Sequence, residues 1–240
     1  MKITIVIPAY NEEDGIGPTL DSIPIEALRT AGYEVEKLVV DNASSDLTAK
    51  IARAHGARVV YQPKRGYGNA YKAGFENAQG DIIATGDADT TYPFDALPEI
   101  LAKLHAEDLD FITTNRLSKL YPRAMQPTHI FGNYVLSLTM RILFRTPFRD
   151  SQSGMWIFRR TVWQHLEVKH NGMPFSQEIK VEAFLKGFRC AEVPIVYRQR
   201  VGEVKLSVVD AWRTMSELFK KRLSASNARP ELDTGSDSAG

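Results

Sequence analysis

Two aspartates one residue apart, Asp87 and Asp89, carry the strongest chemical signal in the sequence. They follow a mostly apolar run at residues 81–86, which is typical of a buried strand ending in a loop. Two carboxylates placed this way can approach one Mg²⁺ or Mn²⁺ ion, which keeps open positions for the oxygens of a diphosphate. An Asp-x-Asp pair is also common in solvated turns, so the neighbouring elements decide its meaning.

Polar loops follow two earlier strands in the same way. Residues 3–7 and 36–40 are β-rich apolar runs closed by Pro8 and Asp41, and the helix-like stretch 16–30 between them completes a βαβ unit. Further alternation of strands and helices predicts an α/β fold with a mostly parallel sheet flanked by helices. Ligands bind outside the carboxyl ends of the strands in such sheets, so we expect these loops to converge on one crevice.

The later part of the chain continues the alternation. We predict a strand at residues 111–114 followed by a polar loop, and an amphipathic helix at residues 207–223. The tail at 224–240 is rich in Ser, Asp, Gly and Ala and has too little apolar content to pack, so we expect it to be disordered. Residues 1–206 are therefore expected to form a single domain.

Composition narrows the class of protein. With 240 residues, 43% of them hydrophobic, and a formal net charge of +1, the chain lacks the basic excess of a nucleic-acid-binding domain. Cys190 is the one cysteine, and the five His have no metal-ligand spacing. The apolar start at residues 1–8 is too short for a secretory signal, and no run has the 18 to 20 or so apolar residues that span a bilayer. We expect a cytoplasmic enzyme.

Four motifs occur along the chain in this order: Ile5-Val6-Ile7-Pro8-Ala9-Tyr10-Asn11-Glu12-Glu13, Asp41-Asn42-Ala43-Ser44-Ser45-Asp46, Gly66-Tyr67-Gly68-Asn69-Ala70 and Gly86-Asp87-Ala88-Asp89. On these motifs the sequence resembles the inverting GT-A (Rossmann-like) glycosyltransferases of family 2. Three later stretches, Asn115-Arg116, residues 150–155 and residues 200–206, resemble more narrowly the dolichol-phosphate mannosyltransferases and polyprenyl-phosphate glycosyltransferases. The resemblance covers residues 3–206.

This resemblance implies the metal-dependent, inverting transfer of a hexose from a nucleotide sugar, of the GDP-mannose or UDP-glucose type, to a polyprenyl or dolichyl phosphate. It implies that Asp89 is the direct ligand of Mg²⁺ or Mn²⁺, with Asp87 near the ribose or the water shell of the metal. The residues that it places around the nucleotide sugar are Pro8, Tyr10, Glu12, Asp41, Asp87 and Ala88.

Basic side chains are expected to position the acceptor. A lipid phosphate is already an oxygen nucleophile near neutral pH, so it needs cationic positioning rather than a general base. The resemblance assigns this role to Arg116, Arg200 and Lys205, with Ser153 as a hydroxyl donor to the phosphate and Gly154 permitting close approach. The alternative interpretation is that each of these cations is an ordinary surface residue.

Other functions stay open at this stage. A glycosyltransferase acting on a sugar hydroxyl would need a base, for which Glu178 is the first candidate and Asp150 the second. The alternative for Glu178 is an acidic residue that merely begins a helix. A nucleotidyltransferase normally has a basic, Gly-rich loop after its first strand, whereas the loop here is acidic. A noncatalytic module that binds a nucleotide sugar is the third alternative.

The sequence also departs from the family pattern. Thr91 stands where a Gln is common after the second aspartate, and Thr is a weaker neutral ligand for a metal. Val204 replaces the usual Ser before Lys205. The loop at residues 64–69 precedes a helix, so its glycines and first N–H groups are candidates to face a phosphate.

Two helical faces combine apolar and basic residues and suit the headgroup region of a membrane. Such faces ordinarily pack on the sheet or on a second subunit. Three interpretations therefore stay open: contact with a membrane surface, binding to a separate membrane partner, and packing within the protein or on a second subunit. The protein would then lie on the cytosolic face of a membrane. The faces consist of Ile130, Phe131, Tyr134, Val135, Leu138, Arg141, Ile142, Leu143 and Arg145, and of Trp212, Met215, Leu218, Phe219, Lys220, Lys221 and Arg222.

Overall fold

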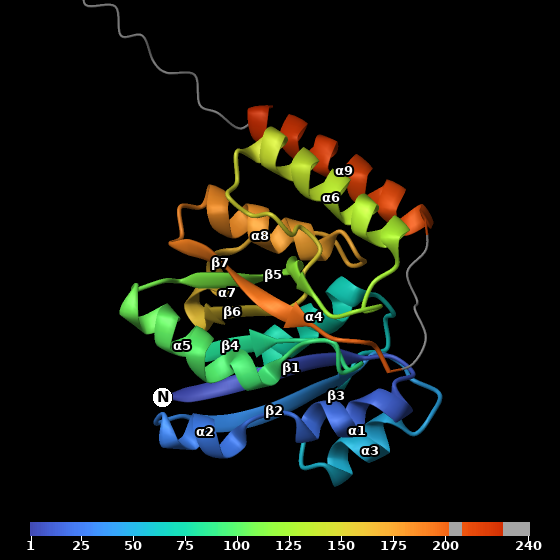
Figure 1. Cartoon of the computed structure of the whole chain (residues 1–240), viewed down its shortest axis with the longest axis vertical. Helices are drawn as coiled ribbons and strands as arrows, with labels where there is room; N and C mark the ends of the chain where they lie inside the picture. Colours follow the sequence, from blue (N-terminus) through green and yellow to red (C-terminus); the bar gives the residue numbers. More distant parts are fainter. Residues whose placement is uncertain (202–207, 228–240) are drawn as a thin grey trace, which may run out of the picture.

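The computed structural model describes residues 1–201 and 208–227, and within the last helix it describes the side chains of residues 214–223. In these residues one seven-stranded sheet runs through the protein in the order β3-β2-β1-β4-β6-β5-β7 (Figure 1). The strands are β1 (Lys2–Ala9), β2 (Glu34–Asp41), β3 (Arg58–Tyr61), β4 (Ile82–Thr85), β5 (Phe111–Leu120), β6 (Trp156–Arg159) and β7 (Cys190–Tyr197). The helices are α1 (Glu13–Asp21), α2 (Ile25–Thr30), α3 (Thr48–Ala54), α4 (Tyr67–Asn77), α5 (Leu97–Ala106), α6 (Pro127–Phe144), α7 (Arg160–His165), α8 (Phe175–Leu185) and α9 (Val208–Asn227), with a 3₁₀ turn, η1 (Phe94–Ala96).

The directions of the strands decide which loops meet. β1 runs parallel to β2 and β4, whereas β6 runs antiparallel to both β4 and β5. β5 therefore points the same way as β4, and β7 runs parallel to β5. As a result, the carboxyl ends of β4, β5 and β7 and the amino end of β6 all lie along one edge of the sheet. The predicted mostly parallel α/β sheet is confirmed, with β6 as its antiparallel strand.

Apolar side chains alternate between the two faces of the sheet, as the period of a strand requires. Ile3, Ile5 and Ile7 of β1 belong to a buried cluster that includes residues of α1 and α5. Val6 of the same strand belongs to a second buried cluster, which includes residues of α4 and α8. Helices cover both faces for this reason, and the apolar runs in the sequence are nearly continuous because both faces are buried.

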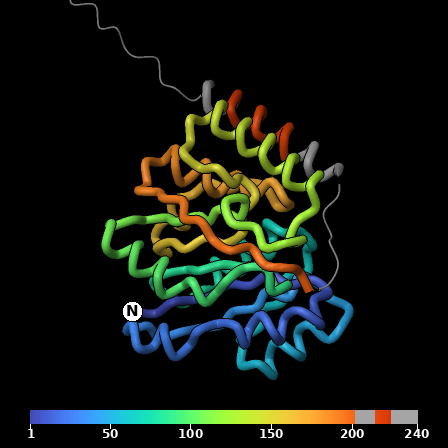
Figure 2. The backbone as a smooth tube through the Cα atoms, in the orientation of Figure 1, coloured from blue at the N-terminus to red at the C-terminus, as the bar shows by residue number. Residues whose placement is uncertain are grey.

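A third apolar cluster lies away from the sheet and joins α6, α8 and α9. It contains Met140, Phe144, Phe148, Val181 and Leu218. α6 and α9 lie side by side at one end of the molecule (Figures 1 and 2). Packing against α6 and α8 therefore accounts for one part of the amphipathic pattern in α9.

The last helix differs in its bounds from the prediction. It begins at Val208 and continues to Asn227, past the predicted end at residue 223. Residues 224–227 thus belong to the helix, because Ser and Asn make helix formation only slightly less favourable than Ala does, and no Pro or Gly interrupts it. The remainder of the predicted tail lies outside the described residues. Within the described part of the chain, none of the helices combines the length and the apolar character that crossing a membrane requires.

Candidate active site

The loops that follow β1, β2 and β4 share an unusual backbone feature. Each contains one non-glycine residue with a positive φ angle: Asn11 at 50°, Ala43 at 61° and Thr90 at 67°. Such conformations are rare for residues with a side chain, and they concentrate at functional sites where the surroundings hold them. The first two loops hold one another, because the Asn11 N–H donates to Ser44 Oγ at 3.0 Å and the Ser45 N–H donates to Asn11 Oδ1 at 2.9 Å.

Asp89 follows β4 and is almost completely buried. Its Oδ1 accepts hydrogen bonds from the Thr91 N–H at 3.2 Å and from Thr91 Oγ1 at 2.6 Å. Thr91 therefore orients the Asp89 carboxylate, and its hydroxyl is engaged in doing so. Asp89 Oδ2 is buried, accepts no hydrogen bond from the described residues, and forms an ion pair with Arg200 at 2.6 Å.

The segment that carries Arg200 lies directly against the Asp89 loop. The Arg198 N–H donates to the carbonyl oxygen of Thr91, and the Val201 N–H donates to that of Asp89, both at 3.0 Å. These bonds bring the end of β7 to the carboxylate pair and place the predicted acceptor cation Arg200 beside the predicted metal ligand. Lys205, the other cation predicted in this stretch, lies outside the described residues.

Asp87 shares its electrostatic environment with the same residues. Burial raises the pKa of Asp87 to about 7, the Asp89 carboxylate adds to the rise, and the cations of Arg200 and Arg116 oppose it. Neighbouring carboxylates that disfavour each other's ionisation attract a cation. The hard carboxylate oxygens fit a divalent metal, although Asp89 Oδ2, which accepts no hydrogen bond, is paired here with the cation of Arg200. No cluster of three or more His, Cys, Asp or Glu that could hold a metal occurs in the described residues.

The residues predicted around the nucleoside lie at the ends of β1 and β2. Asp41 Oδ1 accepts a hydrogen bond from the Ser44 N–H at 3.0 Å, which fixes the loop after β2. The Arg65 guanidinium lies 4.4 Å from the centre of the Tyr10 ring, so this ring already stacks against a flat group. Pro8 pairs with Val40 in the sheet, and the Glu12 N–H donates to Thr48 Oγ1 at 2.8 Å. Ala88 is buried against α1, where its carbonyl oxygen faces Gly15.

The glycines at the beginning of α4 allow another loop to pack closely against it. A side chain on Gly66 would collide with the carbonyl oxygen of Asn171, and one on Gly68 would come within 2.5 Å of that of His170. The Asn69 N–H donates to the Asn171 carbonyl at 3.1 Å. These glycines therefore permit close packing of the loop at residues 169–171, and that loop covers the beginning of α4.

Arg116 forms a buried bidentate ion pair with Asp150. Arg116 Nε and Nη2 donate to the Asp150 carboxylate at 2.8 and 2.9 Å, and the Arg116 main-chain N–H donates to Asp150 Oδ2 at 2.9 Å. Although burial raises it, the pKa of Asp150 is held below its usual value by Arg116. Asp150 is thus a fixed anion rather than a general base. Arg116 lies within β5, which extends through the start of the predicted polar loop, and its guanidinium faces the Tyr197 ring.

The Ser153-Gly154 turn packs onto Asp87. The Gly154 N–H donates to Tyr92 Oη at 2.6 Å, and its carbonyl oxygen accepts from Thr85 Oγ1 at 2.8 Å. A side chain on Gly154 would collide with the Tyr67 hydroxyl and lie 3.4 Å from Asp87 Oδ1. Gly154 is therefore required for the approach of this turn to the carboxylates.

Ser153 does not offer a free hydroxyl to a ligand. It is fully buried, and its Oγ lies 2.6 Å from Thr114 Oγ1. The role predicted for Ser153 as a phosphate donor is not supported by this contact. Tyr92, which was not among the predicted site residues, holds the turn instead. Its position shortly after the Asp-x-Asp pair was a local signal for this role.

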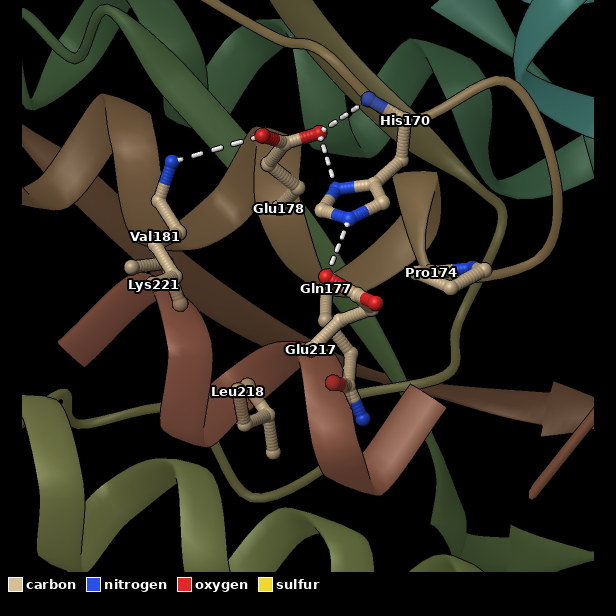
Figure 3. Close-up of a pocket in the computed structure, with 8 residues that line it drawn as sticks. All are labelled: His170, Pro174, Gln177, Glu178, Val181, Glu217, Leu218 and Lys221. Atoms are coloured by element: carbon tan, nitrogen blue, oxygen red, sulfur yellow. Dashed lines mark hydrogen bonds and ion pairs between the residues drawn. The ribbon is translucent and has the colours of Figure 1, made fainter. Parts of the chain in front are cut away.

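Glu178 lies between α8 and α9, in a pocket shared with His170, Glu217 and Lys221 (Figure 3). Its Oε2 accepts from the N–H groups of Lys169 and His170 at 3.0 and 2.8 Å and lies 2.8 Å from His170 Nδ1. Burial raises the pKa of Glu178, but these hydrogen bonds and Lys221 lower it to about 2. A carboxylate held so firmly in its charged form is a poor proton acceptor, so the prediction of Glu178 as a catalytic base is not supported.

Acidic pH is expected to stabilise the contact between α8 and α9. His170 Nε2 lies 2.9 Å from Glu217, and the hydrogen bond that His170 donates to Glu178, together with Glu217, raises the pKa of His170 against the effect of burial. A raised pKa in the folded state adds stability that is complete below the unfolded pKa of about 6.5 and is lost as the pH rises through the folded value. Urea unfolding at pH 5.5 and pH 9 measures this difference.

Substitution of the histidine supplies the control for this prediction. His170→Gln should destabilise the protein more at pH 5.5 than at pH 9, whereas His129→Gln, in α6, should leave the pH dependence as in the wild type. An equal effect of His170→Gln at both pH values would contradict a charged His170.

The structure thus brings several predicted residues to one edge and separates others from it. The charges of Glu12, Asp87, Asp89, Arg116 and Arg200 act on one another there. Glu178 belongs to the α8–α9 contact. This arrangement brings a pair of carboxylates near the buried guanidinium of Arg116 and the partly buried guanidinium of Arg200, which suits the binding of phosphate groups.

Comparison with known proteins places this arrangement in a family. The family model described as Glycosyl transferase family 2 matches residues 4–166. The low-salt glycan biosynthesis hexosyltransferase Agl6 of Haloferax volcanii is 36% identical over 216 residues, which cover 88% of this chain and 51% of Agl6. The chain therefore spans about half the length of that relative. The dolichyl-phosphate hexose transferase of the same organism is 33% identical over 204 residues, covering 85% of this chain and 86% of the relative.

A solved structure shows the same fold. Glucosyl-3-phosphoglycerate synthase from Mycobacterium tuberculosis, crystallised with Mn²⁺, UDP and phosphoglyceric acid, aligns with a TM-score of 0.72 at 21% identity over 96% of this chain and 80% of its own. This likeness confirms the GT-A architecture expected from the sequence. The chain belongs to glycosyl transferase family 2, and it is a glycosyltransferase.

Proposed function

We propose that this protein transfers a hexose, with inversion, from a nucleotide sugar to a polyprenyl phosphate. The observation that carries the proposal is the approach of the Gly154 turn to Asp87, together with the charge of the Arg116 guanidinium, which acts on Asp87 and is paired with Asp150. This arrangement supports a buried guanidinium near the proposed donor site. The similarity to a dolichyl-phosphate hexose transferase supports the same acceptor class.

The donor half of the site would hold Mg²⁺ or Mn²⁺ through Asp89, with Asp87 close by. When bound, such an ion supplies positive charge to the leaving diphosphate. Thr91 fixes the Asp89 carboxylate for this task, since it donates two hydrogen bonds to Oδ1. Tyr10, Glu12 and Asp41 are proposed to surround the nucleoside.

On the acceptor side, an oxygen of the lipid phosphate attacks the anomeric carbon of the hexose. The new carbon–oxygen bond forms as the bond to the diphosphate breaks, and its electron pair leaves with the nucleoside diphosphate. Arg116 and Arg200 position the attacking phosphate, because a guanidinium offers several donors to phosphate oxygens. No proton has to be removed, which agrees with the commitment of Glu178 and Asp150 to other partners. A sugar hydroxyl acceptor would need a base that neither residue supplies.

A transfer assay tests this function. The full chain is incubated with labelled GDP-mannose or UDP-glucose, Mg²⁺ or Mn²⁺, and a short polyprenyl phosphate, and the labelled product is extracted into butanol. We expect a lipid-soluble product from one nucleotide sugar, and we expect no product when polyprenyl alcohol replaces the phosphate. Transfer to the alcohol, or to a sugar hydroxyl in the absence of lipid, would contradict the proposal.

We further propose that the exposed face of α6 binds an anionic membrane surface. Phe131 and Ile142 expose 72% and 68% of their surface, and a groove on the same face is lined by apolar residues together with Arg141 and Arg149. Apolar side chains flanked by arginines match the acyl and headgroup layers of such a membrane. The exposed apolar residues of this face are Phe131, Tyr134, Val135, Leu138 and Ile142.

Liposome binding is the expected result. The protein should sediment with vesicles containing anionic lipid, less so at higher salt, because each basic residue near such a surface contributes about 1 kcal/mol. Arg141→Glu with Arg145→Glu should weaken binding by at least about 10-fold. The charge reversal Arg29→Glu, far along the chain in α2, is the control. Protein that stays in the supernatant in every buffer would point to a separate membrane partner, and a stable dimer that hides α6 would point to packing between two copies.

A further inference from the structure

A buried lysine lies directly beneath the acceptor half of the site. Lys180, on α8, has no solvent-exposed surface. Its Nζ donates to the main-chain carbonyl oxygens of Asp150 at 2.8 Å and Ser151 at 3.0 Å. Lysine is rarely buried unless it is paired, so its presence here calls for a specific role.

The turn at Asp150 and Ser151 is also held by an acidic side chain on its other side. Glu192, on β7, accepts hydrogen bonds at Oε1 from the N–H groups of Arg149 at 2.7 Å and Asp150 at 3.0 Å. Its Oε2 accepts from Asn115 Nδ2 at 3.0 Å. Glu192 on β7 thus binds the N–H groups of the turn, and Lys180 on α8 binds its carbonyl groups. The main chain at Asp150 is therefore fixed from two directions.

Fixing this main chain also fixes the ion pair. The Asp150 carboxylate accepts three hydrogen bonds from Arg116, two of them from the guanidinium, so the position of the carboxylate decides where the guanidinium lies. Arg116, Lys180 and Asp150 are buried around this turn, and Glu192 is partly buried beside them. Burial lowers the pKa of Lys180 to about 7, while Asp150 counteracts the shift. The amine donates to the two carbonyl groups whether or not it carries the extra proton.

We propose that Lys180 is a positioning residue for the acceptor: by holding the Asp150-Ser151 turn, it aligns Arg116 with the attacking phosphate. This inference rests on the proposed function, in which Arg116 binds the lipid phosphate. Lys180 itself does not touch the substrate. Its removal should therefore affect the acceptor and leave the nucleotide sugar bound as before.

Lys180→Met tests this role because it keeps the length of the side chain and removes its donors. We expect the KM for polyprenyl phosphate to rise by about 10-fold or more, as for other supports of a binding residue, with the KM for the nucleotide sugar within about 2-fold of the wild type. Lys186→Met removes a partly exposed lysine just after α8, which pairs with Glu167, and should change neither constant. A rise of both KM values to the same extent, or of neither, would overturn the positioning role.

Arg116→Lys separates this inference from the proposed function. It retains a positive charge opposite Asp150 but loses the guanidinium, which binds the Asp150 carboxylate through Nε and Nη2 and is proposed to contact the phosphate. If Arg116→Lys leaves the acceptor KM unchanged, Arg116 does not bind the lipid phosphate, and that part of the proposed function is wrong. If it raises the acceptor KM and Lys180→Met does not, only the role of Lys180 fails.

The double variant completes the test. If Lys180 acts through Arg116, the two substitutions together should raise the acceptor KM hardly more than Arg116→Lys alone. Multiplied effects would show that Lys180 acts by another route and would overturn the inference. Should Lys180→Met fail to fold in a thermal melt, Lys180→Gln, whose amide keeps N–H donors, replaces it in the same comparison with a smaller expected rise.

Discussion

Asp89→Asn is expected to lower the turnover of hexose transfer by about 100-fold or more, the usual cost of losing one group that stabilises developing charge. The substitution keeps the shape of the side chain and an oxygen that can accept from Thr91, but it removes the negative charge proposed to hold the metal. Initial rates at saturating substrates and a thermal melt of the same preparation measure the effect on a folded enzyme.

Two controls belong with this experiment. Asp95→Asn changes an exposed aspartate that pairs with Arg198 and should leave turnover close to that of the wild type. Excess EDTA should silence the wild-type enzyme, and added Mg²⁺ or Mn²⁺ should restore it. Normal turnover of folded Asp89→Asn protein would refute the assignment of Asp89 as the metal ligand.

Asp150→Ala is expected to destabilise the protein by about 3–5 kcal/mol, because it leaves the Arg116 charge buried without its partner. The Asp150 carboxylate is fully buried, and it also accepts from the main-chain N–H groups of Arg116 and Gln152. Urea unfolding at neutral pH gives the change in free energy. This loss is comparable to the whole stability of a marginal domain, so part of the protein should unfold during expression.

An exposed ion pair provides the comparison. Glu26→Ala removes the partner of Arg29 on the surface of α2, where solvent and salt screen the charges, and should change the unfolding midpoint very little. If Asp150→Ala were as mild as Glu26→Ala, the ion pair would contribute little to the fold, and the placement of Arg116 would need another explanation.

The order of elements was predictable because it is encoded locally. Runs of apolar residues at 3–7, 36–40 and 81–86 mark strands that are buried on both faces, and the polar residues that end them mark the loops. The family motifs lie on those same loops, so the fold and the family followed from short stretches of sequence, whereas the location of the donor site stays a prediction. The comparisons confirm the family and the fold.

Partners far apart in the chain were not predictable in this way. Arg116 and Asp150 are 34 positions apart, and they meet because β6 runs antiparallel to β5 and returns the chain to the same edge. Asp150 and Glu178 were both candidates for a base, since an acidic residue in a sequence does not show what it contacts. In the structure, Asp150 pairs with Arg116, and Glu178 pairs with His170.

What the sequence by itself determined is therefore the sheet, its loops and the class of chemistry at the carboxyl edge. Only the tertiary structure decided that Thr91 orients Asp89, that Gly66 and Gly68 admit residues 169–171, and that Lys180 holds the main chain at Asp150 and Ser151. The physical reason is that burial of apolar residues depends mainly on residue type and period. The role of a polar side chain depends instead on which donor or acceptor the folded chain brings within about 3 Å of it.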